Sequence, residues 1–111
     1  MSYIPDRGDI IWLEFDPQKG HEQKGRRPGI VLSKKEYNQK SNLAIICPIT
    51  SKIKGYPFEV RINSIIQGVI LSDQIRSIDW KSRNAAFIEK IPEEILKEIL
   101  ENIDLLLNEQ V

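Results

Sequence analysis

The stretch Leu43-Ala44-Ile45-Ile46-Cys47-Pro48-Ile49-Thr50 is apolar almost throughout from Leu43 to Ile49. A short apolar run of this kind is typical of a β-strand that is buried on both faces. Cys47 lies inside the run, so we interpret it as a small buried side chain rather than a nucleophile. It is the single cysteine of the chain, which excludes an internal disulfide.

Outward from this run, short strand-like segments alternate with turn signals. They lie at residues 10–15, 30–33, 58–63, 68–71 and around 85–88. Residues 34–40 are compatible with either a short helix or an irregular connection. Many short strands predict a small, strongly bent sheet or a partly closed barrel.

The C-terminal segment has a different pattern, which predicts a helix over about 92–108 after a strand-rich body over about 1–91. Pro92 is placed like a first-turn proline, and Glu93 and Glu94 follow where the helix dipole favours negative charge. Apolar residues then recur at helical spacing: Ile95, Leu96, Ile99, Leu100, Ile103, Leu106 and Leu107. We expect this amphipathic helix to pack along the body or against a second subunit.

Length and composition indicate one globular domain spanning 1–111. The 111 residues are 41% hydrophobic and 29% charged, which is ordinary for a soluble protein. No segment has the apolar length of a membrane helix, and the N-terminus lacks a signal pattern. We therefore expect a cytoplasmic protein without a membrane partner.

The formal net charge is zero, but the charge is unevenly distributed. Residues 1–88 hold 14 basic and 9 acidic side chains, whereas residues 89–111 hold 2 and 7. The body therefore has a basic balance, as expected of a protein that attracts phosphates, and the excess of acidic charge belongs to the C-terminal segment.

The stretch Gly20-His21-Glu22-Gln23-Lys24-Gly25-Arg26-Arg27-Pro28 places acid/base and anion-binding groups within nine residues, directly before the apolar Ile30-Val31-Leu32. Glycine and proline favour turns that hold charged side chains in place. This stretch is a candidate edge of an active site, although a charged surface loop has the same composition.

Several further stretches, taken with this one, resemble the MazF/Kid/PemK family of bacterial toxin endoribonucleases. They occur in order along the chain: Gly8-Asp9-Ile10-Ile11-Trp12, Phe15-Asp16-Pro17, Pro48-Ile49-Thr50, Gly55-Tyr56-Pro57-Phe58-Glu59-Val60 and Asp73-Gln74-Ile75-Arg76-Ser77-Ile78-Asp79. The resemblance implies a mainly β (α+β) fold, an SH3-like partly closed barrel of the CcdB/Kid type with the C-terminal helix, and a homodimer.

RNA cleavage of the kind that the resemblance implies uses the 2′-hydroxyl as nucleophile. The enzyme supplies a base, charge or donors for the phosphoryl oxygens, and a proton for the departing 5′-oxygen. The chain has one histidine, one cysteine and no carboxylate pair at a convincing ligand spacing. We expect no metal and no cofactor, and products with 2′,3′-cyclic phosphate and 5′-hydroxyl ends.

Arg27 and Thr50 are the leading catalytic candidates. The planar fork of Arg27 suits two phosphate oxygens, and the resemblance maps the family's catalytic arginine onto it. An ion pair with a local carboxylate such as Glu22 is the alternative. Thr50 follows the apolar run, and the resemblance matches it to the threonine that works with this arginine; a plain turn-forming role is the alternative.

The general base stays open among Glu22, His21 and Asp73. Burial would raise the pKa of Glu22, but the neighbouring arginines would lower it. His21 has the intrinsic pKa best suited to neutral pH. In Kid-like members the resemblance matches a histidine to His21, an aspartate to Asp73 and an arginine to the position of Leu71, so the mechanism with that arginine does not transfer unchanged.

The predicted substrate is single-stranded RNA, because base-specific reading of RNA needs unpaired bases. Lys52 and Lys54 are expected to follow the backbone, and Phe15 and Tyr56 to stack on bases, with a core role for Phe15 as the alternative. The predicted contacts are completed by Gln23, Gln74 and Ser77.

The resemblance also implies a partner, a MazE-like antitoxin with a flexible, acidic and apolar C-terminal segment. Two other functions remain: a CcdB-like gyrase poison without catalysis, and an inert interaction module. CcdB-like toxins end in Trp-Gly-Ile, whereas this chain ends in Asn108-Glu109-Gln110-Val111. An inert module would leave the candidate catalytic residues without a role.

Overall fold

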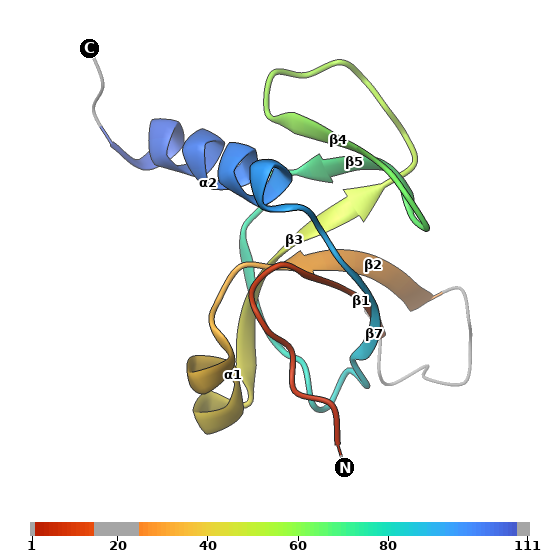
Figure 1. Cartoon of the computed structure of the whole chain (residues 1–111), viewed down its shortest axis with the longest axis vertical. Coiled ribbons are helices and arrows are strands. Elements are labelled where there is room, and N and C mark those ends of the chain that lie inside the picture. The colour runs from red at the N-terminus through yellow and green to blue at the C-terminus, as the bar shows by residue number, and fades with distance from the viewer. Residues whose placement is uncertain (1, 15–24, 109–111) are drawn as a thin grey trace.

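The computed structural model describes residues 2–14 and 25–108 as a bent β-sheet body with one long helix along its side (Figure 1). Its elements are β1 (Asp9–Glu14), β2 (Arg26–Val31), α1 (Lys35–Ser41), β3 (Leu43–Thr50), β4 (Glu59–Asn63), β5 (Gln67–Leu71), β6 (Arg76–Asp79), β7 (Ala86–Lys90) and α2 (Glu93–Leu107). Phe15, His21, Glu22 and Gln23 lie outside the described residues.

Strand β3 pairs with three other strands along its length. Its residues 43–46 pair with β6, residues 46–48 with β2, and residues 49–50 with β5, all antiparallel. The remaining order in the described sheet is β4-β5-β3-β2-β1-β7. Because β3 serves both parts of the sheet, the sheet bends around it into the partly closed barrel that the sequence predicted.

Two apolar clusters cover the opposite faces of β1, β2 and β3. Ile10, Ile30 and Cys47 belong to the cluster beneath α2, whereas their neighbours in the same strands point into a second cluster that contains Trp80. Alternate side chains of a strand point to opposite faces, so the sequences of these strands are apolar at successive positions because both faces are buried. The prediction that residues 43–49 are buried is confirmed except at Leu43, which is half-buried, and at Ile45, which is 36% exposed.

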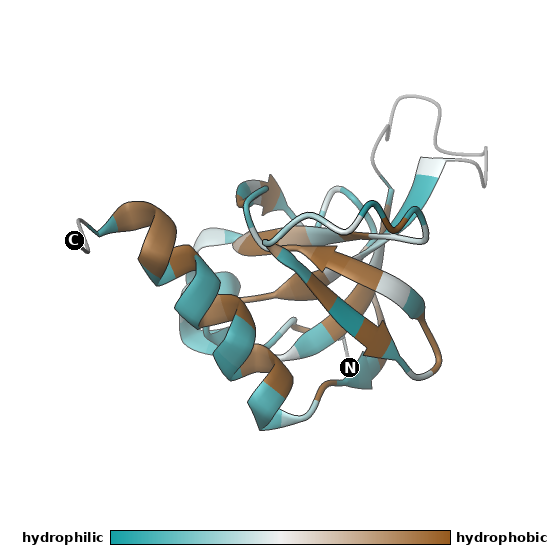
Figure 2. Ribbon diagram, turned by 90° about the horizontal axis from the view of Figure 1, so that it is seen from above, coloured by the Kyte–Doolittle hydropathy of each residue, from teal (hydrophilic) through white to brown (hydrophobic). Residues whose placement is uncertain are grey.

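Helix α2 confirms the predicted C-terminal helix. Its first turns pack on the body through Ile95, Leu96, Ile99 and Ile103. Figure 2 shows its brown apolar stripe beside teal polar residues. Pro92 is the N-cap residue rather than the first helical one. No helix in the described ranges is long and apolar enough to cross a membrane.

Two strand predictions differ from the structure. β2 begins at Arg26, four residues earlier than predicted, because Arg26, Arg27 and Pro28 continue the ladder opposite Glu14, Leu13 and Trp12 in β1. Pairing with β1 thus overrides the turn preference of this glycine- and proline-flanked sequence. β6 was not predicted as a strand. It forms because its backbone pairs with the first half of β3.

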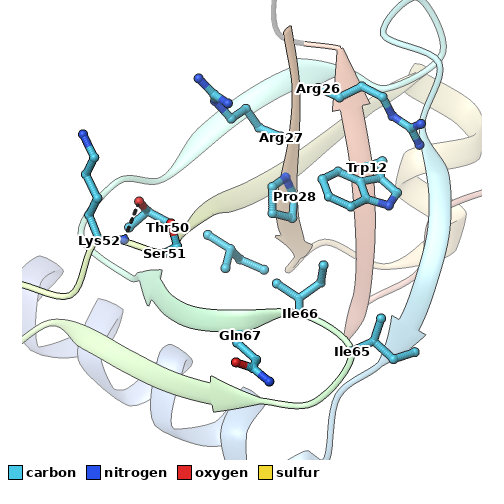
Figure 3. Close-up of a pocket in the computed structure, with 11 residues that line it drawn as sticks. Trp12, Arg26, Arg27, Pro28, Thr50, Ser51, Lys52, Ile65, Ile66 and Gln67 are labelled. Atoms are coloured by element: carbon cyan, nitrogen blue, oxygen red, sulfur yellow. Dashed lines mark hydrogen bonds between the residues drawn. The ribbon is translucent and has the colours of Figure 1, made fainter. Parts of the chain in front are cut away.

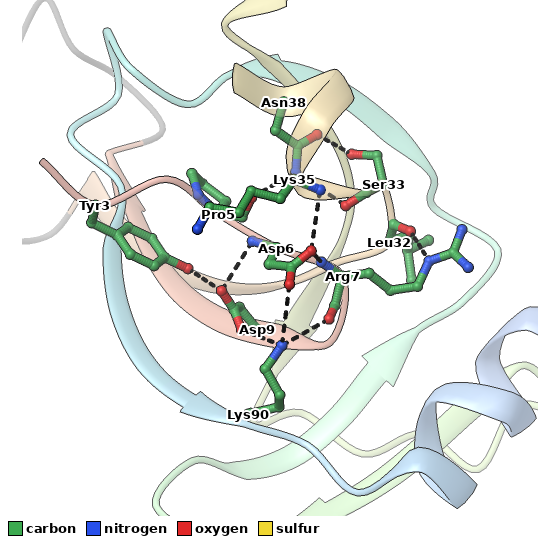
Figure 4. Close-up of polar contacts among 10 residues, drawn as sticks. All are labelled: Tyr3, Pro5, Asp6, Arg7, Asp9, Leu32, Ser33, Lys35, Asn38 and Lys90. Carbon is green, nitrogen blue, oxygen red and sulfur yellow. Dashed lines mark hydrogen bonds and ion pairs between the residues drawn. The ribbon is translucent and has the colours of Figure 1, made fainter. Parts of the chain in front are cut away.

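A polar network fixes the N-terminal segment to β7 and α1 (Figure 4). The Asp9 carboxylate is 4% exposed and accepts hydrogen bonds from Tyr3 Oη at 2.5 Å and Asp6 N at 3.0 Å. Lys90 Nζ lies 3.0 Å from the other oxygen of Asp9. Burial, followed by this hydrogen bond, raises the pKa of Tyr3 above its ordinary value. The buried aspartate therefore keeps its charge compensated, as a buried carboxylate requires.

Gly68 allows β5 to approach the end of β3. Its φ is +144°, a backbone conformation that residues other than glycine rarely adopt. A Cβ at this position would lie 2.2 Å from the carbonyl oxygen of Thr50. The absence of a side chain at Gly68 therefore permits this close approach to the Thr50 backbone.

We predict that Gly68→Ala lowers the free energy of unfolding and displaces Thr50. Strained backbone alone costs about 1–3 kcal/mol, and the contact with the Thr50 carbonyl adds to it. Chemical denaturation measures the effect. Gly55→Ala is the matched control, since φ at Gly55 is +82° but nothing lies within 4 Å of its added Cβ. Equal destabilisation by the two substitutions would contradict the role assigned to the close approach.

Candidate functional site

A pocket opens where β3 leaves β2. The pairing of these two strands ends at Pro48, and Ile49 and Thr50 pair with β5 instead. The space between β2 and β5 has a volume of about 580 Å³, and we call it the arginine pocket (Figure 3). It is lined by Trp12, Arg26, Arg27, Pro28, Ile49, Thr50, Ser51, Lys52, Ile65, Ile66 and Gln67.

Arg27 enters this pocket from a strand and not from a loop. It lies opposite Leu13 in the β1–β2 ladder, so its backbone is held by a neighbouring strand. Its side chain is exposed, and no carboxylate among the described residues forms a salt bridge with it. The predicted alternative, an ion pair with Glu22, falls outside those residues. The guanidinium is thus held at the wall of a pocket where an anion can reach it.

Thr50 stands across the pocket at the end of β3, and its hydroxyl serves a turn without losing its donor. Thr50 Oγ1 accepts a hydrogen bond from Lys52 N at 3.2 Å. A hydroxyl carries one donor and two acceptor sites, so its hydrogen remains available to an oxygen in the pocket. The turn-forming and functional interpretations of Thr50 are therefore compatible.

A second, smaller pocket adjoins the first and shares Thr50 and Lys52 with it. Its volume is about 240 Å³, and we call it the tyrosine pocket. It is lined by Thr50, Lys52, Lys54, Tyr56, Phe58, Glu59, Leu71, Asp73 and Gln74. Six residues that the sequence marked as catalytic or substrate-binding are thus brought together here, from β3, the following loop and the β5–β6 connection.

Glu59 holds the loop that carries Lys54 and Tyr56. Its carboxylate accepts backbone hydrogen bonds from Lys54 N at 3.2 Å and Gly55 N at 2.9 Å. Lys54 Nζ lies 5.9 Å from the centroid of the Tyr56 ring, and Tyr56 is 62% exposed. The ring and the ammonium group therefore stand together at the rim, a combination suited to a base and its phosphate.

Asp73 lines the tyrosine pocket but not the arginine pocket. The preceding residue, Ser72, is fully buried and donates from Oγ to the Phe58 carbonyl oxygen at 2.5 Å. Asn102 Nδ2 of α2 donates to the same Ser72 oxygen at 3.2 Å. Asp73 thus follows a residue that the Phe58 carbonyl and the Asn102 side chain of α2 hold in place.

Cys47 is buried beside this region and is unsuited to be a nucleophile. It is 0% exposed, and burial, followed by the negative charge of Asp73, raises the pKa of its thiol to about 12. The thiolate is the reactive form. The interpretation of Cys47 as a buried structural side chain is confirmed.

Among the described residues that the sequence marked, Ser77 alone lies away from the two pockets. Ser77 lies on β6 opposite Ile45 and lines neither pocket. Phe15, His21, Glu22 and Gln23 lie outside the described residues. Of the three candidate bases, the structure therefore places Asp73 alone.

Sequence reasoning missed one wall of the arginine pocket. Trp12 lies opposite Pro28, and the Arg26 guanidinium carbon lies 5.2 Å from the centroid of the Trp12 ring. Alternation along residues 10–14 puts Trp12 on the same strand face as the charged Glu14, a signal that the ring is not wholly buried. Gln67, on the far wall, carried no such signal.

Basic side chains outnumber acidic ones around the two pockets: the described lining of the arginine pocket holds no acidic residue, whereas Glu59 and Asp73 lie beside the lysines of the tyrosine pocket. Arg26, Arg27, Lys52 and Lys54 line the pockets. Four of the five acidic side chains of α2, namely Glu93, Glu94, Glu101 and Asp104, line a separate groove along the helix. The unequal charge of body and tail is thus a separation in space, and the pockets are electrostatically suited to a phosphate backbone.

Comparisons with known proteins agree with this arrangement. The chain is 44% identical over 106 residues to the endoribonuclease toxin MazF of Escherichia coli (strain K12), covering 95% of this chain and 96% of that protein. It is 32% identical over 108 residues to the endoribonuclease PemK of Escherichia coli, covering 92% and 81%. A chain of the crystal structure of MazE-MazF from Deinococcus radiodurans superposes with a TM-score of 0.87, at 40% identity, over 98% of this chain and 100% of that one. Residues 6–107 match the family of PemK-like, MazF-like toxins, and the chain therefore belongs to this family of type II toxin–antitoxin system toxins.

Proposed function

We propose that this protein is the toxin of a toxin–antitoxin pair and a sequence-specific, metal-independent endoribonuclease acting on single-stranded RNA. The observation that carries the proposal is the arginine pocket, where Arg27 from β2 and Thr50 from β3 line one space. Two strands that diverge there supply a guanidinium and a hydroxyl to the same anion. The curated relatives, which are named as endoribonucleases, support it.

The proposed reaction is an internal transesterification. The 2′-oxygen of one nucleotide attacks the adjacent phosphorus, the bond to the 5′-oxygen breaks, and the products carry a 2′,3′-cyclic phosphate and a 5′-hydroxyl. Charge on the phosphoryl oxygens grows in the transition state, where Arg27 is placed to compensate it. The Thr50 hydroxyl donates to one of these oxygens.

Two protons move in this reaction. One leaves the 2′-hydroxyl for a base, and one reaches the departing 5′-oxygen. Asp73 is a candidate for the general base, and its place in the lining of the pocket that also contains Thr50 supports this role. His21 and Glu22 stay candidates on sequence grounds. Arg27 acts through its charge, because a guanidinium keeps its proton far above neutral pH.

A single strand is the substrate that the two pockets accommodate together. The scissile phosphate is placed near Thr50, which both pockets share, so the chain extends into a pocket on each side. Lys52 and Lys54 accompany the backbone, and Tyr56 offers a ring to a base. A duplex keeps its bases stacked and paired, so it cannot occupy such pockets.

We predict that the protein cleaves a long single-stranded RNA in the presence of EDTA, and that Arg27→Ala lowers the rate on the order of 100-fold or more. Gel electrophoresis, with end-group analysis for cyclic phosphate, measures the result. Arg61→Ala is the matched control, since Arg61 is an exposed arginine on β4 that lines neither pocket. Intact RNA with folded wild-type protein would overturn the proposed nuclease activity. The gyrase-poison alternative would then be assayed.

The proposed protein partner is an antitoxin with a flexible segment that is both acidic and apolar. The two pockets supply cations beside the Trp12 and Tyr56 rings, which complement a segment of that composition. A flexible segment orders on binding and can cover a long groove.

We predict that co-expression with a cognate antitoxin of this kind yields a stable complex and that the complex does not cleave RNA. Lys52→Glu combined with Lys54→Glu should weaken the complex, because each charge reversal places like charges together. Co-purification and the RNA assay measure the two effects. An antitoxin that binds without lowering cleavage would contradict occupation of the pockets.

We further propose a cytoplasmic homodimer. A groove of about 470 Å³ beside the end of α2 is almost wholly apolar, and we call it the apolar groove. Its lining includes Tyr37, Ile75 and Leu107, which are 45%, 40% and 73% exposed. Large exposed apolar patches commonly mark interfaces between proteins. A second copy presenting the same surface would cover these side chains.

We predict that Ile75→Glu shifts the protein from dimer to monomer, because a charge would be buried in an apolar interface. Sedimentation analysis measures the molar mass. Ile53→Glu is the control, since Ile53 is 47% exposed and lies outside the apolar groove. A wild-type monomer, or an Ile75→Glu dimer as stable as wild type, would contradict this interface.

A further inference from the structure

The β4–β5 turn, which forms the far wall of the arginine pocket, is held by a side chain from β7. The Glu89 carboxylate accepts hydrogen bonds from Ser64 Oγ at 2.5 Å and from Ile65 N at 3.1 Å. Within the turn, Ser64 N donates to the Ile66 carbonyl oxygen at 3.2 Å. Bonds to an ionised acceptor are stronger than neutral ones, so Glu89 fixes the turn to the opposite end of the sheet.

Glu89 also belongs to the strand that supports the near wall. β7 pairs with β1, with Glu89 opposite Ile10 and Ala86 opposite Trp12. The near wall of the pocket contains Trp12 and Pro28, and the far wall contains Ile66 and Gln67. Both walls are therefore connected to β7, the near wall by strand pairing and the far wall by the Glu89 hydrogen bonds. The separation between the two walls depends on this one carboxylate as well as on the sheet.

The two walls differ in chemistry from the Arg27–Thr50 side of the pocket. The Trp12 ring is half-buried with the Arg26 guanidinium 5.2 Å from its centroid. Ile65, which is 71% exposed, and Gln67 stand across from it (Figure 3). A flat ring and aliphatic side chains suit the faces of a planar aromatic group, and a carboxamide offers both a donor and an acceptor to its edge.

We propose that this part of the arginine pocket binds one unpaired nucleobase next to the scissile phosphate, and that Glu89 is a positioning residue for its recognition. The proposal rests on the ribonuclease function proposed above and deepens it. The base lies against the Trp12 indole, the Gln67 carboxamide reads its edge, and Glu89 holds the turn that presents Gln67. Arg26 adds positive charge for the neighbouring phosphate.

Cleavage of a random-sequence single-stranded RNA pool, followed by sequencing of the new ends, tests the recognition. Gln67→Ala and Trp12→Ala should relax the preference at one nucleotide position beside the cleaved bond and raise KM about tenfold or more. Trp12→Phe keeps an aromatic ring, so its nucleotide preference and its KM should lie between those of wild type and Trp12→Ala. Tyr56→Ala is the comparison, because it lines the other pocket and should alter a different position. Unchanged cleavage sites and KM in folded Gln67→Ala protein would overturn the proposal.

Glu89 is tested in the same assay. Glu89→Ala should relax the same position as Gln67→Ala while leaving kcat within a few-fold of wild type, and Glu89→Gln should restore part of the preference because its amide oxygen still accepts from Ile65 N. Glu98→Ala, on an exposed position of α2, is the matched control. A general loss of kcat without a change of preference would show a merely structural role and overturn this assignment.

The failure of the nuclease is distinguishable from the failure of the base pocket. If wild-type protein cleaves no RNA, the proposed function falls, and Trp12 fluorescence in a Trp80→Phe background is titrated with a single-stranded oligoribonucleotide. Quenching that Gln67→Ala weakens about tenfold supports the base pocket. Absence of quenching overturns it. If wild-type protein cleaves and the variants keep its sites, the base pocket alone is wrong.

Discussion

The backbone hydrogen bonds of β3 are the constraint on which the other elements depend. The eight consecutive residues of β3, Leu43–Thr50, pair along their length with β6, then with β2 and then with β5. Buried backbone groups must be paired, so each of those strands is confined to the portion of β3 that remains open to it. The bend of the sheet, the two apolar clusters and the location of the pockets follow from this division of one strand among three partners.

The pocket is a direct consequence of the same division. Since β3 leaves β2 at Pro48 and joins β5 at Ile49, the ends of β2 and β5 are separated, and side chains from both face the space between them. Proline lacks a backbone donor, and Pro48 stands at the last paired position. Gly68 lets β5 approach the Thr50 carbonyl without a clash. Arg27 and Thr50 therefore owe their common pocket to backbone geometry more than to any contact between them.

Local patterns predicted much of the fold because they reflect burial on a strand or helix face. The apolar run at 43–49, the alternation at 58–63 and the helical spacing after Pro92 all correspond to observed elements. β6 had no such pattern, because three of its four residues are exposed and it forms through pairing with β3. The start of β2 was misplaced for a related reason. Its ladder with Trp12 and Leu13 outweighs the local preferences of Arg26, Arg27 and Pro28.

Residue identity alone is enough to show which side chains have the chemistry of the site, since Arg27, Thr50, Asp73 and the loop lysines carry charge or hydroxyl groups wherever they lie. The net negative charge of residues 89–111 likewise follows from composition alone. The tertiary structure decided which of these groups share a pocket: Thr50 joins two pockets, Asp73 lines one of them, and Ser77 lines neither. It also decided that Trp12 and Gln67, which lie far apart in the chain, line the arginine pocket, and that Glu89 bonds the turn beside it. Such proximity depends on strand pairing between distant segments, and no local pattern of residues encodes it.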